Sequence, residues 1–218
     1  MANEHGDFLK IRIPCLGSRL WAECQAMHNR MPKKHFTLLG TCGIPVADLR
    51  GAGRERQRDV QHGIGVEEWE GGSRYDGQFY WGKKQGYGVY SWPDGSLYMG
   101  QWDSNAINGY GHYMGKDGRE FQGLWHEAVI HGCGRYTWPD GRTFQGQYAD
   151  DQKHGFGTFT WQDGRRFDGF WQHGKQHGYG ITSKTDGTVL KEGHWVRGQY
   201  FQDPSPLSAD NNPPVPDS

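Results

Sequence analysis

Histidines recur at a regular spacing along this sequence and are its most obvious candidates for metal binding or acid–base chemistry. They share one position of a 23-residue period with two amide side chains, in the column His62, Gln85, Asn108, His131, His154 and His177. If one period spans two strands, successive members lie ~10 Å apart, whereas a Zn²⁺ ion needs ligands ~2.0–2.1 Å away. The spacing therefore argues against a shared metal, and the amide substitutes favour a hydrogen-bonding role at a turn.

A second set of potential metal ligands lies near the N-terminus and consists of Cys15, Cys24, His28, His35 and Cys42. It contains no C-x₂₋₄-C pair, so its spacing does not match the usual zinc motifs. Four cysteines are also too few for the disulfide framework of a secreted domain of this length. The N-terminal residues lack the apolar run of a signal peptide. We therefore expect no bound metal and an intracellular, reducing setting.

The sequence contains no arrangement of nucleophiles, acids and bases that is typical of a catalytic site. Serines such as Ser91 and Ser104 lack the context of a nucleophile elbow. The recurring Gly-x-Gly pairs have neither the third glycine nor the strand–helix setting of a nucleotide-binding loop. A formal net charge of −1 argues against non-specific nucleic-acid binding. We expect a protein that is not an enzyme, needs no cofactor and binds no nucleic acid.

Two pairs of basic residues are candidates for binding an anionic phospholipid: Lys83 with Lys84, and Arg165 with Arg166. Each basic residue near an anionic membrane contributes only ~1 kcal/mol. The two pairs occupy different positions in the period, and a carboxylate, Asp168, follows the second pair closely. A solvated surface of mixed charge is the favoured interpretation, and phospholipid binding stays an alternative.

The elements that would position these residues come from an internal repeat with a period of 23 residues. Glycines two residues apart recur in step, as Gly86 and Gly88, Gly109 and Gly111, Gly132 and Gly134, Gly155 and Gly157, and Gly178 and Gly180. Aromatic residues form equally regular columns, one of them Tyr75, Tyr98, Phe121, Phe144 and Phe167. Several columns in register over more than half of the chain predict a repeat architecture.

Each unit reads as a β-hairpin. The segment YDGQFYW alternates and indicates a strand, GKKQG supplies a turn, YGVYSW indicates a second strand, and PDG forms a second turn. The predicted fold is therefore all-β: an elongated, single-layer antiparallel β-meander with two strands per unit. Because residues two apart point to the same face of a strand, we expect each glycine pair to leave a shallow trough that holds an aromatic ring.

Units such as YDGQFYWGKKQGYGVYSWPDG and FQGQYADDQKHGFGTFTWQDG resemble MORN repeats, whose pattern is Y-x-G-x-W-x-x-G-x-x-x-G-x-G followed by an Asp-Gly or Asn-Gly turn. The resemblance covers about residues 62–200, as a half unit, five full units and a degenerate half unit. It implies a twisted sheet that serves as a protein-interaction scaffold in cytoskeletal, ciliary or membrane-associated assemblies, or as a regulatory segment of a larger protein. Asn105, Ala128 and Asp151 stand where a turn glycine is expected, which leaves the local turn type open.

The flanks do not repeat. Residues 1–61 are basic and include a charged segment from Arg50 to Asp59, which indicates a linker in a partly disordered region. Residues 201–218 are rich in Pro and Asp and are predicted to be a disordered tail. The repeats are expected to be ordered although hydrophobic residues make up only 34% of the chain, because aromatic residues make up 14%.

One aromatic column is our candidate for partner binding, because contiguous exposed aromatic surface marks interaction sites. Trp102, Trp125, Tyr148 and Trp171 recur at one position and should form a line ~30 Å long. A segment of a partner protein, or a second copy of this chain in a homodimer, would fit such a line. The alternative is that packing on the glycines uses these rings completely, and we expect this more of Trp102 and Trp171 than of Tyr148.

Overall fold

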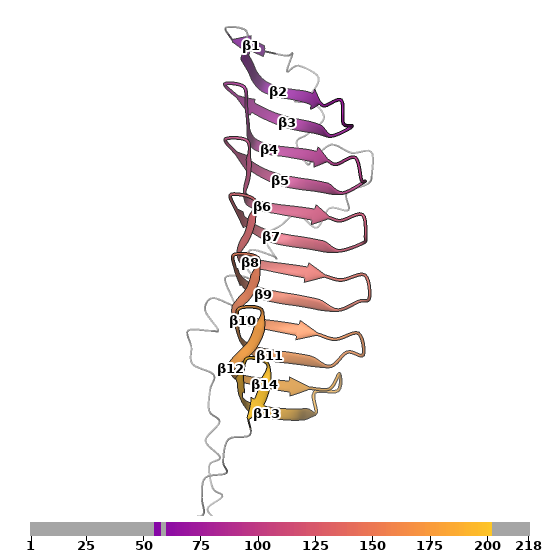
Figure 1. The fold of residues 1–218 in the computed structure, drawn as a ribbon, viewed down its shortest axis with the longest axis vertical. Helices are drawn as coiled ribbons and strands as arrows, with labels where there is room; N and C mark the ends of the chain where they lie inside the picture. Colours follow the sequence, from indigo (N-terminus) through magenta and orange to yellow (C-terminus); the bar gives the residue numbers. More distant parts are fainter. Residues whose placement is uncertain (1–54, 58–59, 202–218) are drawn as a thin grey trace, which may run out of the picture.

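The computed structural model describes residues 55–57 and 60–201, and every regular element within them is a β-strand. The strands follow one another in chain order in one open antiparallel sheet of 14 strands (Figure 1). They are β1 (Glu55–Gln57), β2 (Val60–Glu68), β3 (Arg74–Tyr80), β4 (Lys83–Ser91), β5 (Leu97–Asp103), β6 (Ala106–Met114), β7 (Glu120–His126), β8 (Val129–Thr137), β9 (Thr143–Ala149), β10 (Gln152–Thr160), β11 (Arg166–Gln172), β12 (Lys175–Ser183), β13 (Val189–Val196) and β14 (Gln199–Phe201). The predicted all-β meander is confirmed. Within the described ranges there is no helix able to cross a membrane.

The N-terminal edge of the sheet differs from the prediction. Part of the charged segment that we expected to be a linker forms β1, in which Arg56 pairs with Gln61 of β2. Pairing on a sheet edge uses backbone groups and needs no hydrophobic pattern, so the composition of the segment gave no sign of it. Residues 1–54, 58–59 and 202–218, which belong to the two regions where we predicted disorder, lie outside the described residues.

Each hairpin of the array is asymmetric, because seven-residue strands alternate with nine-residue strands over most of the sheet. In the β3–β4 hairpin, Gly77 pairs with Gly88 and Phe79 pairs with Lys84, so the longer strand forms a bulge between these pairs. Gly86 lies in the bulge with φ +70°, a left-handed conformation that glycine adopts without steric cost. Bulges bend the strand that carries them, and this bend recurs in every full unit.

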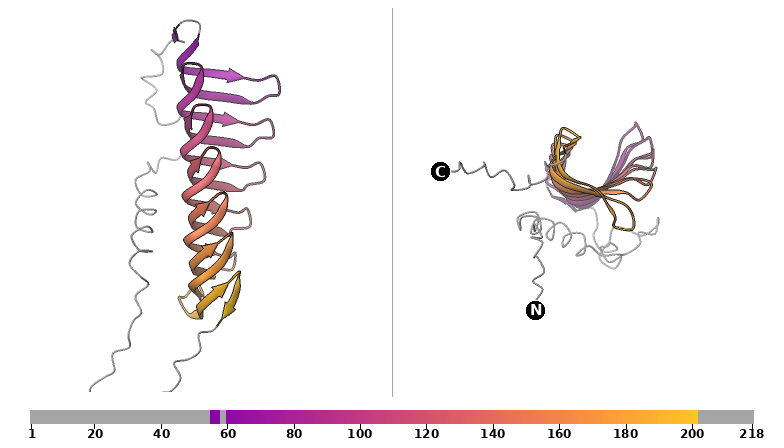
Figure 2. Two further views of the ribbon diagram at one scale, coloured as in Figure 1. Left: turned by 60° about the vertical axis from the view of Figure 1, so that its left-hand side comes forward. Right: turned by 90° about the horizontal axis from the view of Figure 1, so that it is seen from below.

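The bend closes the sheet around one of its faces. The buried aromatic columns lie on the inner side of this curve. There the Tyr75 ring lies along its own strand over Gly77 and reaches the Phe79 ring, with centroids 5.1 Å apart. Viewed along its long axis, the sheet has a trough-shaped cross-section (Figure 2). We call the concave side of the sheet, which carries the aromatic columns, the groove, and the opposite side the outer face.

The tight hairpin turns keep one geometry despite their varied sequences. Glu127 and Ala128 have φ +48° and +66°, and Asn105 has φ +74°, which is the pattern of two-residue type I′ turns. The backbone N–H of Ala128 donates to the carbonyl of Ile107 in the preceding unit over 2.8 Å. Asn105 adds a side-chain contact, since its Oδ1 accepts from the Lys84 N–H over 2.8 Å. The missing glycines therefore leave the turn type unchanged.

Candidate binding surfaces

The floor of the groove is a row of rings with 0–1% exposure, which we call the core rings: Tyr75, Tyr98, Phe121, Phe144 and Phe167. Each lies over the second glycine of a pair. A Cβ added to Gly88 would lie 2.4 Å from Tyr75 Cε2, and one added to Gly157 would lie 2.4 Å from Phe144 Cζ. The predicted packing of rings into glycine troughs is thus confirmed for the second glycine of the pair.

The first glycine of a pair plays a different part, and our expectation that both glycines face the ring was wrong. A Cβ on Gly86 would meet Gln78 Oε1 at 2.1 Å, and one on Gly155 would meet Gln147 Oε1 at 2.0 Å. These glutamines lie on the outer face, where Gln78 Oε1 accepts a hydrogen bond from the Tyr87 N–H over 2.7 Å. The bulge turns the backbone between the two glycines, so the simple two-residue alternation fails there.

The aromatic column proposed for partner binding is largely packed into the core. Trp102 and Trp171 are each 7% exposed and Tyr148 is 5% exposed, while Trp125 is partly buried. Trp102 and Trp171 make edge-on contacts of 5.1 Å with Tyr75 and Phe144, and their indole N–H groups donate to the carbonyls of Gly88 and Gly157. Tyr148 is as buried as the tryptophans, contrary to the difference that we expected.

The aromatic surface left open in the groove belongs to two other columns, which form two ladders of rings in edge or tilted contact. The N-terminal ladder is Trp69, Tyr90, Trp92 and Tyr113, with successive centroids 4.7–5.8 Å apart. The C-terminal ladder is Tyr136, Trp138, Phe159 and Trp161, with successive centroids 4.5–5.8 Å apart. Gly115 replaces the tryptophan between them. Most ladder rings are only partly buried. The columns were visible in the sequence, but their accessibility depends on the bend.

Two lysines lie on the rings from within the groove. Lys84 Nζ is 4.6 Å from the Trp69 ring centroid and forms an ion pair of 2.9 Å with Glu67. Lys153, three units further along, has its Nζ 5.2 Å from the Trp138 centroid and 5.4 Å from that of Trp171. Both contacts are within the range of cation–π attraction. From the sequence we considered Lys84 only as a lipid ligand, and Lys153 was not among the candidate residues.

The four basic residues proposed for phospholipid binding do not form one patch. Arg165 pairs with Asp163 over 2.6 Å, Arg166 pairs with Asp168 over 2.5 Å, and Lys84 pairs with Glu67. Lys83 is exposed and pairs with Tyr80 across the hairpin, on the outer face, whereas Lys84 pairs with Phe79 in the groove. Three of the four charges thus have carboxylate partners, which weakens the electrostatic case for a lipid site.

The histidine column holds no metal site in the described part of the chain, where no group of three metal-ligating side chains was found. His154 has His173 as a ring neighbour, with centroids 6.5 Å apart, and His131 has Asp150 within 3.5 Å. The set from Cys15 to Cys42, at which we expected no metal, lies outside the described residues.

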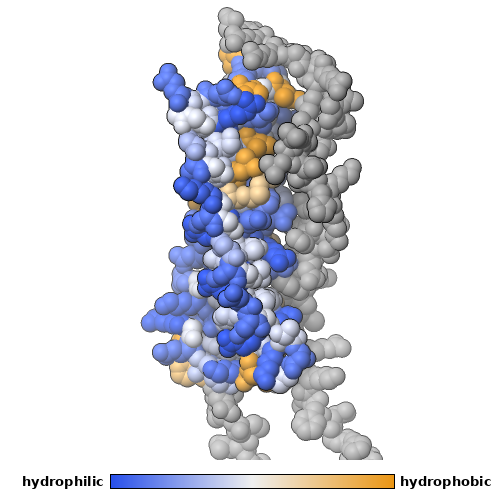
Figure 3. Space-filling model, turned by 90° about the vertical axis from the view of Figure 1, so that its right-hand side faces the viewer, coloured by the Kyte–Doolittle hydropathy of each residue, from blue (hydrophilic) through white to orange (hydrophobic). Residues whose placement is uncertain are grey.

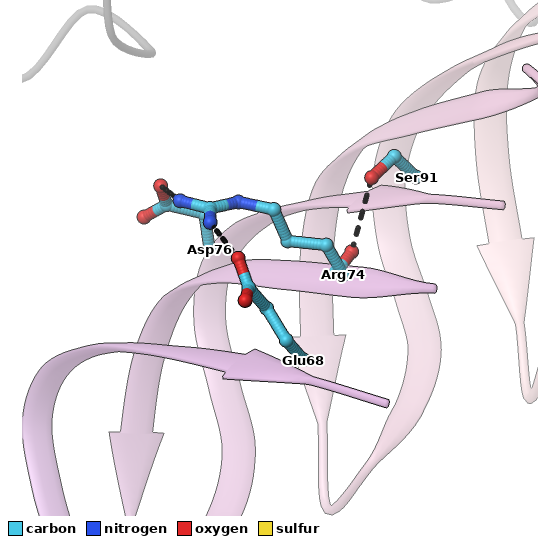
Figure 4. Close-up of polar contacts among 4 residues, drawn as sticks. All are labelled: Glu68, Arg74, Asp76 and Ser91. Carbon is cyan, nitrogen blue, oxygen red and sulfur yellow. Dashed lines mark hydrogen bonds and ion pairs between the residues drawn. The ribbon is translucent and has the colours of Figure 1, made fainter. Parts of the chain in front are cut away.

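The outer face changes in character along the array. Apolar side chains meet across β4–β6, where Val89 pairs with Met99 and Leu97 pairs with Met114. Figure 3 shows hydrophobic residues gathered toward this end, above a largely hydrophilic surface. An ion-pair cluster borders it, in which Arg74 bridges the carboxylates of Glu68 and Asp76 (Figure 4).

The geometry defines a class of protein, a linear β-repeat array in which each of the described strands pairs only with its neighbours in the chain. The family model described as MORN repeat matches residues 57–74, 75–97, 98–118, 121–141, 144–165 and 167–189. These segments cover more than half of the chain, and the chain belongs to the MORN-repeat family.

A comparison with curated proteins found no match. Among solved structures, the chain is similar to the TCP domain of SAS-4 (dCPAP) from Drosophila melanogaster, solved in complex with a proline-rich motif of Ana2 (dSTIL), at 9% identity and a TM-score of 0.36 over 57% of this chain and 75% of that chain. It is also similar to the wild-type TCP10 domain of CPAP from Danio rerio, at 13% identity and a TM-score of 0.33 over 63% and 74% of the two chains. Values this low carry no functional conclusion.

Proposed function

We propose that this protein is a non-catalytic scaffold that binds a segment of a partner protein along its groove. The observation that carries the proposal is the pair of partly buried aromatic ladders, which line the groove beside a fully packed core. Trp and Tyr are the residues most enriched at binding hot spots, and a solvated strand needs no such rings. MORN repeats generally mediate protein or membrane interactions, which fits both this proposal and the alternative of phospholipid binding.

Binding to an anionic phospholipid is the alternative function. Attraction to a membrane grows with the number of basic residues near its surface, and Arg165 and Arg166 each have a carboxylate within 2.6 Å. Because these charges are already paired, while the ladders offer aromatic surface, a protein segment is favoured over a lipid headgroup. A homodimer through the same groove is a second alternative, and light scattering of the purified chain tests it by measuring the mass in solution.

The setting that we propose is intracellular, in the cytoplasm, the cytoskeleton or a cilium, either as a separate protein or as a regulatory segment of a larger one. This proposal rests on the family. Imaging of the tagged chain in ciliated cells tests it, and a signal confined to the secretory pathway would contradict it.

Site-specific photo-crosslinking in cells tests the proposed function. A benzoylphenylalanine would replace Trp138 or Trp161 on the C-terminal ladder, and a matched control would carry it at Thr158, which pairs with Asp168 on the outer face. We expect discrete protein adducts from the ladder positions and fewer from the control. Equal adducts from both faces would refute the groove as the binding surface, and no adducts together with strong flotation on phosphatidylserine vesicles would favour phospholipid binding.

A further inference from the structure

Lys153 occupies an unusual place in the groove. It belongs to a column that faces the aromatic core, and the other members of this column are Lys84, Ile107, Ile130 and Gln176. Its Nζ lies 5.2–5.6 Å from four ring centroids, those of Trp138, Phe144, Phe159 and Trp171. The ammonium group therefore stands among aromatic rings at a position where two other units carry an isoleucine.

The charge of Lys153 lacks the partner that its counterpart has. Glu67 forms an ion pair with Lys84. For Lys153, three units later, the residue at the same position is Tyr136 of the C-terminal ladder, which carries no charge to pair with it. Glu67 is also the one carboxylate of β2–β13 at a groove-facing position, where it pairs with Tyr75. Among the described residues no carboxylate lies within ion-pair distance of Lys153.

The surroundings of Lys153 make this unpaired charge unfavourable in the free protein. Burial lowers the pKa of Lys153, and the nearby Arg142 guanidinium lowers it further. Arg142 itself pairs with Asp140 over 2.7 Å, so this carboxylate is already in use. Lys153 is nonetheless partly exposed, and an anion entering the groove can reach it.

We propose that the groove over β8–β11 binds an acidic, apolar peptide segment of a partner protein, with an Asp or Glu carboxylate accepting a hydrogen bond from Lys153 Nζ. Apolar side chains on either side of that carboxylate pack on Tyr136, Trp138 and Trp161. The proposal rests on the proposed function and adds the chemistry of the partner. A peptide fits better than a lipid headgroup, because the arginines at the groove margin, Arg142 and Arg165, are paired with Asp140 and Asp163.

A peptide-display selection on the immobilised full chain tests the proposal. Random 12-residue peptides would be selected on the unchanged protein, on Lys153→Met and on Lys175→Met. Lys175 is an exposed lysine that pairs with Gln172 on the outer face, so its loss changes the net charge equally. Isoleucine occupies the Lys153 column in the two preceding units, so Lys153→Met is expected to fold, which circular dichroism checks.

We expect enriched peptides with Asp or Glu beside apolar residues, and an acidic peptide from this set should bind Lys153→Met about tenfold more weakly or worse. The same peptide should bind Lys175→Met unchanged. Enrichment of apolar peptides with no acidic preference, equal on all three proteins, would overturn the role of Lys153 and leave the proposed function standing. No enrichment, together with flotation on phosphoinositide vesicles, would overturn both.

Discussion

Gly157→Ala separates the two ways in which glycines act in this sheet. Gly157 pairs with Gly146 and Gly169 in the middle of the sheet, and its φ is not left-handed. An added Cβ would lie 2.4 Å from Phe144 Cζ and 2.7 Å from its Cε2. Gly141→Ala is the matched control, because Gly141 has φ +87° and a Cβ there meets nothing within 4 Å. The first variant adds a clash and the second adds only backbone strain.

The expected cost of the clash follows from how firmly the ring is held. The Phe144 ring would have to retreat by roughly 1 Å to restore ordinary contact. It is fully buried and has Tyr148 and Trp171 edge-on at 5.2 and 5.1 Å, so it has little room. Overpacking costs ~1–3 kcal/mol, and we expect ~2–3 kcal/mol for Gly157→Ala. Gly141→Ala should cost about 1 kcal/mol.

A double-mutant cycle with Phe144→Leu provides the assay, with urea unfolding of the full chain followed by tryptophan fluorescence and by circular dichroism. The shorter leucine relieves the clash, so Gly157→Ala and Phe144→Leu should couple by ~1 kcal/mol or more, while Gly141→Ala and Phe144→Leu should add within ~0.5 kcal/mol. Coincidence of the two probes is needed, because a repeat array can unfold in steps. Additivity of Gly157→Ala with Phe144→Leu, or a cost no larger than that of Gly141→Ala, would refute the reasoning.

Three further predictions concern a turn, a charge and two phenols. Ala128→Gly should stabilise the protein by ~0.5–1 kcal/mol, because Ala128 has φ +66° and glycine adopts this conformation freely; an unchanged or lower melting temperature would count against it. Lys153→Met should leave the free energy of unfolding unchanged or raise it by up to ~1 kcal/mol, since the loss of a cation–π contact of ~0.5–2 kcal/mol is offset by removal of a buried charge; a destabilisation above ~2 kcal/mol in urea would contradict this. Burial raises the pKa of Tyr75 and of Tyr98 above the ordinary 10. The contribution of these two phenols to the free energy of unfolding is therefore complete below pH 10. It is lost as the pH rises above 10, because the unfolded chain releases these protons first. Urea midpoints at about pH 8 and 11 should therefore fall less in the Tyr75→Phe, Tyr98→Phe double variant, and an equal fall would show that these phenols do not carry the effect.

The arrangement of the fold could be predicted from the sequence because its determinants are local and repeated. The strand order follows from hairpins, and each hairpin is marked by aromatic alternation and by turn dipeptides such as Asp94-Gly95. The loop at this dipeptide has the expected bonds, since the Gly95 N–H donates to the Trp92 carbonyl over 3.0 Å and Asp94 Oδ1 accepts from the Ser96 N–H over 2.9 Å. This last bond lowers the pKa of Asp94.

The division of rings between core and surface could not be predicted in the same way. Trp102 and Trp92 belong to aromatic columns with the same 23-residue period, and both face the groove, but only the bend at the bulge decides which of them is covered. The turn at Glu127 and Ala128 was equally hidden, because neighbouring units impose its left-handed φ values against local preference. The ion pair of Arg165 with Asp163, in contrast, could have been predicted from the sequence. Asp-Gly-Arg occurs at three successive turns, beginning at Asp117, and the Asp and Arg pair in each of them.

Pairing only between chain neighbours has a consequence for the length of the array. Each tight turn bonds to the unit before it, as Gly174 does when its N–H donates to the Lys153 carbonyl over 3.0 Å. A duplication or excision of 23 residues would thus reproduce interfaces that already exist. A change between Lys84 and Lys153 would also alter the separation of these two lysines by one step of ~10 Å. The number of hairpins between two charged side chains therefore sets their separation along the groove. This separation can change by whole repeats while the fold stays the same.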